Sequence, residues 1–190
     1  MYGFRTGKDM DLEDFRREEP EQAFEAPLKK NIVLAGMSGA GKTTVGTLLA
    51  RLTGRILIDT DALIEEKAGK KIRKIFEEIG EAGFRDMETS VIRELENTGD
   101  AVISTGGGAV LRRENVESLK KNGIIFFLER NLKDIEPSDE RPLADSLEKI
   151  EALYASRYPL YKRIADETVH LKGTPEEAAM EILERYRDKT

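Results

Sequence analysis

The stretch GMSGAGKTTVG, from Gly36 to Gly46, combines four glycines with a lysine and three hydroxyl side chains. It satisfies the pattern G-x-x-x-x-G-K-[ST], in which glycines let backbone N–H groups turn toward phosphates and the lysine reaches the β- and γ-phosphates. The apolar run IVLA precedes the stretch and TLLARL follows it, so the loop joins a strand to a helix N-terminus, where anions bind. A turn that binds nothing is the weaker interpretation. The predicted ATP-binding residues of this loop are Gly39, Ala40, Gly41, Lys42, Thr43 and Thr44.

Oxygen ligands for a metal ion follow the lysine and the next apolar run, ILID. Thr43 and Asp59 present a hydroxyl and a carboxylate, which suit Mg²⁺. Asp61 lies two residues further, where the helix DALIEEKAG is expected to begin, and its alternative role is that of a helix N-cap. A GTP-specific switch protein should carry N-K-x-D, and NLKD at Asn131 has the lysine one place late. We therefore expect ATP and Mg²⁺.

The elements that must position these residues alternate along the chain. Four apolar runs of strand length, NIVLAG, RILID, DAVIST and GIIFFLE, are separated by segments with helical spacing. IVLA and IIFFL are apolar at consecutive positions, as in parallel strands covered on both faces. A last strand, TVHL, and a last helix, PEEAAMEILERYR, with Thr174 as its cap and Pro175 in its first turn, close the domain. The sequence predicts an α/β fold: a three-layer α/β/α P-loop domain with a central five-stranded parallel sheet and a short lid.

Composition limits the partners. The formal net charge of −6 argues against a dedicated nucleic-acid binder, which would need clustered Lys and Arg. No apolar run approaches the roughly 18 residues of a membrane span, and the first residues lack the apolar centre of a secretory signal. With no cysteine, there is no thiolate metal site. We expect a cytoplasmic protein with a charged N-terminal extension, residues 1–30, followed by a P-loop kinase domain, residues 31–190.

From about Asn31 to its end, the chain resembles shikimate kinase in six ordered segments. They are GMSGAGKTTVG, DTD, GKKIRKIFEEIGEAGFRDMETSVIREL, VISTGGGAVL, RPLA and ASRYPLYKRIAD. The resemblance implies transfer of the γ-phosphate of ATP to the 3-hydroxyl of shikimate, a step of aromatic amino-acid biosynthesis. It also implies the nucleoside monophosphate kinase fold, with a mobile lid at about residues 130–143. We expect a monomer whose partners are ATP and shikimate.

The resemblance also assigns roles residue by residue. Asp61 would bond the hydroxyl that is phosphorylated, and Arg85 and Arg157 would hold the substrate carboxylate as planar, bidentate partners. Arg141 of the RPL motif would stabilise charge on the β- and γ-phosphates. The implied catalytic residues are Lys42, Asp61 and Arg141. The implied substrate-binding residues are Asp61, Arg85, Glu88, Gly106, Gly107, Gly108 and Arg157, with Glu88 holding Arg85 in place.

Without the resemblance, plainer interpretations of several residues come first. Arg85 is spaced for a solvated ion-pair network with Glu81 and Glu88. The glycines Gly106 to Gly108 fit an ordinary loop, and Arg157 fits a packed helix face among tyrosines. His170, the only histidine, is expected on a strand near the sheet edge with no role in catalysis.

The segment RNLKDIEPSDE between the strand IIFFLE and Arg141 departs from the family pattern. It looks several residues shorter than the usual lid. Its acidic residues, with the flanking one, are Glu129, Asp134, Glu136, Asp139 and Glu140. A further lid arginine has no counterpart unless Arg130 fills that place. Two other functions stay open: phosphorylation of another small hydroxy acid such as gluconate, and nucleotide binding without catalysis.

Overall fold

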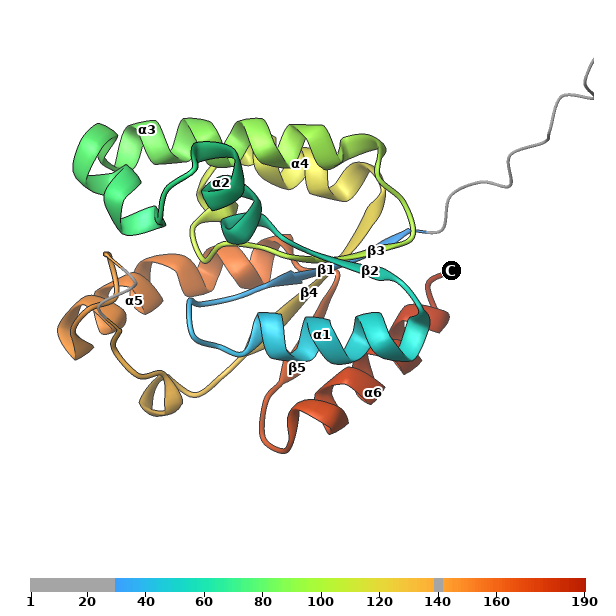
Figure 1. The fold of residues 1–190 in the computed structure, drawn as a ribbon. Coiled ribbons are helices and arrows are strands. Elements are labelled where there is room, and N and C mark those ends of the chain that lie inside the picture. Colours follow the sequence, from blue (N-terminus) through green and yellow to red (C-terminus); the bar gives the residue numbers. More distant parts are fainter. Residues whose placement is uncertain (1–29, 139–141) are drawn as a thin grey trace, which may run out of the picture.

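The computed structural model describes residues 30–138 and 142–190. The predicted N-terminal extension, apart from Lys30, lies outside the described residues, and so does Arg141. Figure 1 shows a twisted sheet with helices on both faces. Among the described residues every helix is too short or too polar to span a bilayer.

The sheet has five parallel strands in the order β2-β3-β1-β4-β5. Their bounds are β1 Asn31–Ala35, β2 Ile56–Asp59, β3 Ala101–Ser104, β4 Gly123–Glu129 and β5 Glu167–His170. The central strand β1 is buried along its whole length, and so are the middle residues of β4, as the continuous apolar runs require. The predicted five-stranded parallel sheet is confirmed, and His170 lies at the end of an edge strand as expected.

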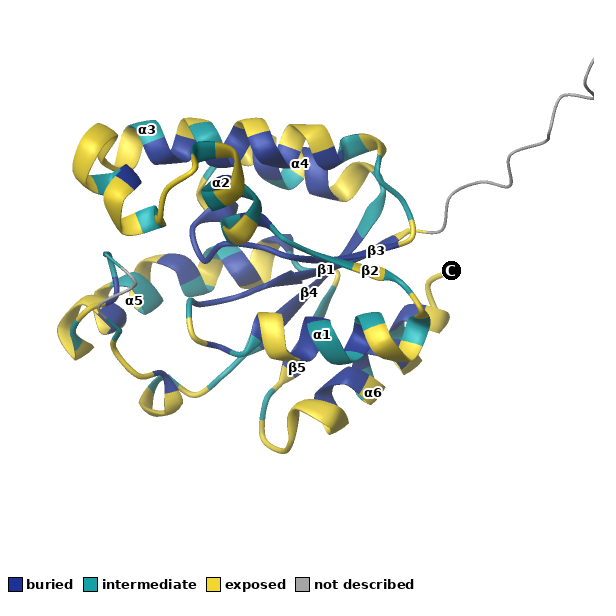
Figure 2. Ribbon diagram, viewed as in Figure 1, coloured by how far each residue is buried: buried dark blue, intermediate teal, exposed yellow. Residues whose placement is uncertain are grey.

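In the described part of the chain, six α-helices cover the sheet, and their inner faces are buried while their outer faces are exposed (Figure 2). Their bounds are α1 Lys42–Thr53, α2 Thr60–Ala68, α3 Ile72–Glu94, α4 Arg113–Lys121, α5 Leu147–Ile164 and α6 Pro175–Arg187. Alternate residues of β1 face opposite layers, because side chains alternate along a strand. Ile32 and Leu34 pack in a cluster with α1 and α6, whereas Val33 and Ala35 pack with α3, α4 and α5. The predicted three layers are therefore confirmed.

The helix after ILID corrects one prediction. It begins at Thr60, one residue before the predicted start, and its N-cap is Asp59. The Asp59 carboxylate accepts hydrogen bonds from the backbone N–H groups of Asp61 and Ala62, at 3.1 and 3.3 Å. Asp61 is thus not the cap, and its carboxylate is available for another role.

The helix α3 consists of two helical halves joined by a kink at Gly80. There φ is 70° and ψ is −177°, a conformation that glycine adopts without the steric cost of a side chain. The kink separates the half that carries Ile72 and Phe76 from the half that carries Arg85 and Glu88. The final helix agrees with its prediction: Thr174 and Glu177 form a capping box, and Pro175 is the first helical residue.

Candidate active site

The phosphate loop connects β1 to α1 and is shaped by three glycines with positive φ. Gly36, Gly39 and Gly41 have φ values of 149°, 82° and 97°. A Cβ at Gly36 would lie 2.8 Å from the carbonyl oxygen of Leu128, so the loop can leave the sheet here only with glycine. The Lys42 ammonium donates to the carbonyl oxygens of Gly36 and Met37, at 2.9 and 2.8 Å. The Lys42 side chain therefore folds back onto the backbone of the phosphate loop.

The two predicted metal ligands meet beside this loop. The Thr43 hydroxyl donates to the Asp59 carboxylate at 2.8 Å and lies 3.4 Å from the hydroxyl of Ser104, at the end of β3. A hydroxyl and a carboxylate are hard oxygen ligands of the kind that Mg²⁺ prefers, usually completed by phosphate oxygens and water. Among the described residues there is no cluster of three or more His, Asp or Glu side chains that would hold a metal without phosphate. The donor set fits Mg²⁺ delivered with a nucleotide.

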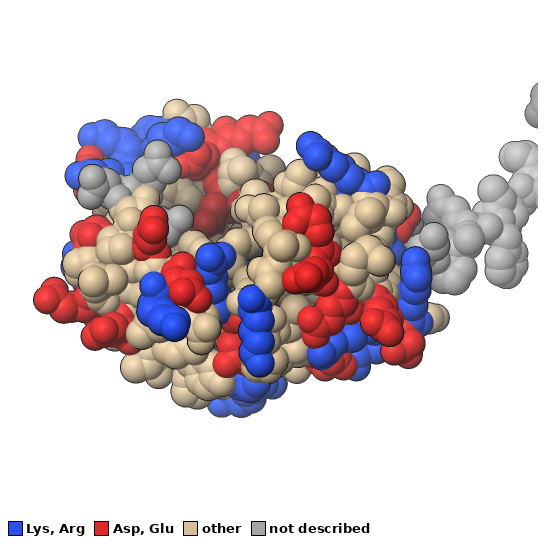
Figure 3. All heavy atoms as spheres, turned by 90° about the horizontal axis from the view of Figure 1, so that it is seen from below, with Lys and Arg blue, Asp and Glu red and all other residues tan. Residues whose placement is uncertain are grey.

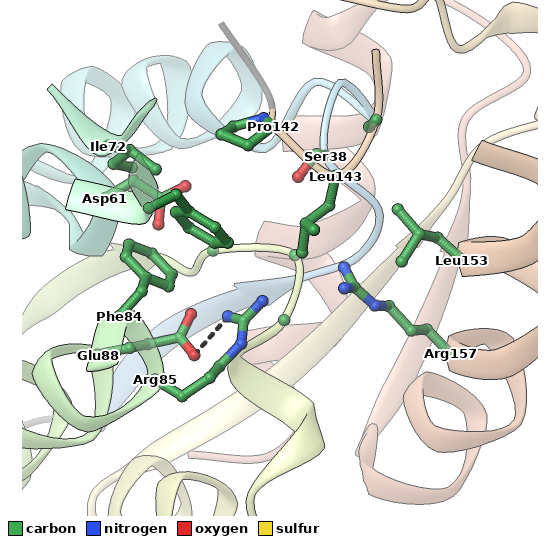
Figure 4. Close-up of a pocket in the computed structure, with 15 residues that line it drawn as sticks. Ser38, Asp61, Ile72, Phe84, Arg85, Glu88, Pro142, Leu143, Leu153 and Arg157 are labelled. Atoms are coloured by element: carbon green, nitrogen blue, oxygen red, sulfur yellow. Dashed lines mark hydrogen bonds and ion pairs between the residues drawn. The ribbon is translucent and has the colours of Figure 1, made fainter. Parts of the chain in front are cut away.

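A second pocket adjoins the loop and encloses roughly 500 Å³ of space between protein atoms, part of it open to solvent (Figure 4). Arg85, Glu88 and Arg157 point into it from two sides, with Asp61 and Ser38 across from them. Its apolar wall consists of Ile72, Phe76, Phe84, Leu143 and Leu153. The structure brings all seven predicted substrate-binding residues to this lining: Asp61, Arg85, Glu88, Gly106, Gly107, Gly108 and Arg157.

Arg85 is held on two sides inside this pocket. Its Nη1 donates to Oε2 of Glu88 at 2.8 Å, and its Nη2 to Oε1 of Glu81 at 3.2 Å. The Arg85 side chain is 9% exposed and the Glu88 side chain is fully buried, so the pair is not the solvated network that the spacing alone allows. The guanidinium lies against Gly108, where a Cβ would overlap Cζ and both terminal nitrogens. Only glycine leaves room for the arginine here.

Arg157 reaches the same pocket from α5. It is 4% exposed, so it does not serve a surface face of the helix. One turn later on α5, Tyr161 donates a hydrogen bond from its hydroxyl to the carbonyl oxygen of Gly107 at 2.5 Å and stacks on Phe127. Burial lowers the pKa of Arg157, and the nearby Arg85 lowers it further. Two guanidinium groups thus share one partly dry pocket, which favours an anionic occupant.

Asp61 places a carboxylate between the phosphate loop and the acceptor pocket. Burial raises its pKa to about 6, the Lys42 ammonium counteracts this, and the carboxylates of Asp59 and Glu88 add to it. Oδ1 of Asp61 and Oε1 of Glu88 are buried without a hydrogen-bond partner among the described residues. A Cβ at Gly106 would lie 2.5 and 2.9 Å from these two atoms. Two carboxylate oxygens therefore lie close to the glycine loop, Gly106 to Gly108, and each can accept a hydrogen bond from a hydroxyl group.

The lid side of the pocket is described only in part. Pro142, Leu143 and Ala144 of the RPLA motif line the acceptor pocket, while Arg141 itself is outside the described residues. Arg130 lies at the phosphate loop, where its Nη1 would be 3.7 Å from a Cβ at Gly41. Arg130 and Gly39 also line a shallow surface site with two of the predicted acidic lid residues, Asp134 and Glu136. Arg130 therefore lies beside the phosphate loop, and its role as the further lid arginine stays a prediction.

Sequence reasoning missed several residues of the site. Ser38 places its backbone N and hydroxyl 2.9 and 2.8 Å from a Cβ position at Gly107, so the phosphate loop and the acceptor pocket share one wall. Thr60 accepts a hydrogen bond from the N–H of Gly106 at 3.0 Å. A single hydroxyl residue forms no sequence motif. The contacts of Ser38 and Thr60 become visible only in the structure, where the ends of β1, β2 and β3 meet. The remaining missed residues are Ser104, Tyr161 and the apolar wall.

The comparisons with known proteins agree with this geometry. A sequence model of the shikimate kinase family matches residues 38–187. A shikimate kinase from Burkholderia lata is 47% identical over 143 residues, which are 72% of this chain and 78% of that protein. A solved shikimate kinase from Acinetobacter baumannii in complex with shikimate is 38% identical, with a TM-score of 0.81, and the match covers 85% of this chain and 95% of that one.

A gluconokinase from Sinorhizobium meliloti 1021 has a TM-score of 0.56 over 85% of this chain and 94% of its own, but only 17% identity. A likeness at that identity extends to the fold alone. The family model, the Burkholderia relative and the Acinetobacter structure point to one conclusion. The chain belongs to the shikimate kinase family.

Proposed function

We propose that this enzyme transfers the γ-phosphate of ATP to the 3-hydroxyl of shikimate, giving shikimate 3-phosphate. The observation that carries the proposal is the position of Asp61. Its carboxylate interacts electrostatically with Lys42 of the phosphate loop on one side and with Arg85 of the acceptor pocket on the other. A hydroxyl bound to Asp61 would thus lie between the phosphates and the anchored carboxylate of its own ring.

In this proposal Arg85 and Arg157 bind the shikimate carboxylate, and the backbone of Gly106 to Gly108 lines the ring. Glu88 holds the Arg85 guanidinium at 2.8 Å, which fixes its planar fork before the substrate arrives. The three glycines leave no side chain between the ring and the backbone. Arg85 is already paired with Glu88 and Glu81, but an acceptor without a carboxylate would bring no anion to the buried guanidinium of Arg157, so the pocket favours an acid.

Phosphoryl transfer needs placement and charge stabilisation more than covalent chemistry. Lys42 and the loop N–H groups of Gly39 to Thr44 bind the phosphates, and Arg141 stabilises charge from the lid. Thr43 and Asp59 would hold Mg²⁺, which neutralises charge on the phosphate oxygens when bound. Asp61, poised by its raised pKa, orients the hydroxyl and accepts its proton.

We propose that the enzyme acts as a monomer. The proposal places the kinase domain at residues 31–190, the lid at about 130–143 and a charged extension at 1–30. It also places the enzyme in the cytoplasm, where ATP and the acceptor are available.

A coupled assay with ATP, Mg²⁺ and shikimate tests the proposal, with gluconate in place of shikimate as the parallel acceptor. We expect turnover with shikimate and none above background with gluconate. Folded wild-type protein that binds ATP and turns over neither acceptor would indicate a nucleotide-binding protein without catalysis. Faster turnover of gluconate would replace the acceptor but keep the chemistry.

A further inference from the structure

We infer that Arg112, the N-cap of α4, is a positioning residue that holds Arg85 in register with the loop Gly106 to Gly108. The inference rests on the proposed function, because Arg85 is there the anchor of the acceptor carboxylate. Arg112 directly follows the short 3-10 helix η3, Ala109–Leu111, which itself follows Gly108. It does not line the acceptor pocket, so it would act only through other residues.

Among the described residues, the hydrogen bonds of Arg112 converge on the turn of α3 that carries Arg85, and a longer ion pair, at 3.9 Å, joins Arg112 to Glu114 of α4. Its Nη1 donates to the backbone carbonyl of Arg85 and to the hydroxyl of Thr89, both at 3.1 Å. Its Nη2 donates to the carboxylate of Asp86 at 2.7 Å. A guanidinium has a rigid planar fork of donors, so three acceptors on one turn fix both its position and that of the turn.

The other end of this connection is the glycine loop itself. Within η3, the N–H of Ala109 donates to the carbonyl of Gly106 at 3.1 Å and that of Leu111 to the carbonyl of Gly108 at 3.0 Å. The buried Asn115 donates to the carbonyl of Ala109 at 3.1 Å. The segment between Gly108 and Arg112 is therefore a short, internally bonded link.

Arg85 is thus held at both of its ends by one short piece of chain. Its backbone carbonyl accepts from Arg112, and its guanidinium lies against Gly108, four residues earlier. Because a Cβ at Gly108 would overlap the guanidinium, there is no slack between the arginine and the loop. A small shift of α3 away from the loop would move the guanidinium off the carboxylate position, and displacements of about 1 Å at a site can cost on the order of 10²-fold in rate.

The charge of Arg112 acts in the same direction. Burial raises the pKa of Glu88, while the cations Arg85, Arg157 and Arg112 lower it. Arg112 therefore helps to keep Glu88 ionised, and an ionised Glu88 is what holds the Arg85 guanidinium. Arg112 thus supports Arg85 in two ways: through its hydrogen bond to the Arg85 backbone carbonyl, and through its positive charge, which favours the ionised form of Glu88.

The test compares Arg112→Ala with Arg113→Ala, its immediate neighbour. Arg113 is matched in type and position, but its side chain is 91% exposed and bonds only Glu117 on its own helix. For Arg112→Ala we expect the KM for shikimate to rise about tenfold while the KM for ATP stays within about twofold. For Arg113→Ala we expect both KM values to be unchanged. Arg112→Lys keeps the charge but loses the fork, so its KM for shikimate should lie between wild type and Arg112→Ala.

The Asp86→Ala and Thr89→Val variants approach the same contacts from the α3 side and keep the inference testable if Arg112→Ala does not fold. Each should raise the KM for shikimate severalfold, and combining Asp86→Ala with Arg112→Lys should give less than the product of the single effects. Equal increases in both KM values, or no increase in any variant, would overturn the inference. Wild-type enzyme that does not turn over shikimate would instead count against the proposed function.

Discussion

The phosphate loop takes its shape from consecutive residues, Gly36 to Gly46, whereas the acceptor pocket is assembled from residues as far apart as Ser38 and Arg157. The loop uses backbone: three glycines with positive φ and a helix N-terminus. The pocket uses side chains, and Arg85, Glu88 and Arg157 are all buried. A backbone N–H costs less to remove from water than a charged group does, so the buried charges depend more on being paired.

The two regions differ in the substitutions that would disrupt them. The loop tolerates changes that keep its backbone angles, because its donors are N–H groups common to every residue. The pocket depends on a chain of pairings, from Arg112 to Arg85 to Glu88 and on to the glycine loop. By contrast, acidic and basic side chains are interspersed on the face shown in Figure 3.

The largest expected effect tests the side-chain part of the loop. Lys42→Ala removes the ammonium that reaches the β- and γ-phosphates, so turnover should fall by about 10³-fold or more. Steady-state assay of phosphate transfer measures this loss. Lys67→Ala is the control, because Lys67 forms an exposed ion pair with Glu94 and should leave the rate unchanged. A Lys42→Ala variant that retains a tenth of wild-type turnover would show that the backbone alone suffices.

The second largest expected effect concerns Asp61, whose carboxylate lies between the phosphate loop and the acceptor pocket. Asp61→Asn should lower turnover by at least about 10²-fold with ATP binding retained. Asp188→Asn, on the exposed end of α6, is the matched control. Unchanged turnover in Asp61→Asn would remove Asp61 from the mechanism.

The same variant should be more stable than wild type at neutral pH. Burial raises the pKa of Asp61 from 3.8 to about 6, so the folded protein binds this proton more tightly than the unfolded chain does. The stability from proton binding is fully present below pH 3.8 and is lost as pH rises through 6. Asp61→Asn should therefore gain on the order of 2 kcal/mol in unfolding free energy near neutral pH. Urea unfolding measures the gain, which should disappear in acid.

A smaller effect separates the glycines of the pocket from glycines elsewhere. Gly108→Ala places a Cβ where the Arg85 guanidinium lies, so the KM for shikimate should rise at least about tenfold while the KM for ATP holds. Gly69→Ala is the contrast: its φ of 63° makes alanine costly in stability, but no atom lies within 4 Å of its Cβ position. It should lower the unfolding free energy by about 1 kcal/mol and leave both KM values unchanged. Similar kinetics in the two variants would contradict the close fit at Gly108.

The smallest effect is a pH dependence. A base with a pKa of about 6 loses its charge in mild acid, so kcat/KM for shikimate should be about fourfold lower near pH 5.5 than near pH 7.5. The rate should fall as pH falls, because the ionised form of Asp61 is the one that accepts the proton. A flat profile over this range would show that Asp61 does not titrate there.

The same contrast explains what could be predicted from the sequence. The loop motif, the strands and the last helix with Thr174 as its cap depend on neighbouring residues, and the structure confirms the fold that they indicate. Arg85 and Glu88 are one turn apart, so their pairing was also within reach of local spacing. The roles predicted for the site residues remain predictions, although the structure places the described ones together.

What could not be predicted depends on contacts between distant segments. Ser104 approaches Thr43 because β3 lies beside β1, and Arg112 reaches Arg85 because η3 returns to α3. The helix cap was the alternative role weighed for Asp61, and Asp59 performs it, because a DTD sequence offers two carboxylates at one helix start and spacing alone does not choose between them. Asp59 combines both uses, since one of its oxygens caps α2 and the other accepts from Thr43.

The close approach of Arg85 to Gly108 has an evolutionary consequence. Every missense change in a glycine codon introduces at least a Cβ, and at this position that atom would collide with the guanidinium. Any missense change at codon 108 would therefore require the end of the Arg85 side chain to move. The same change would displace the group that is proposed to anchor the acceptor carboxylate.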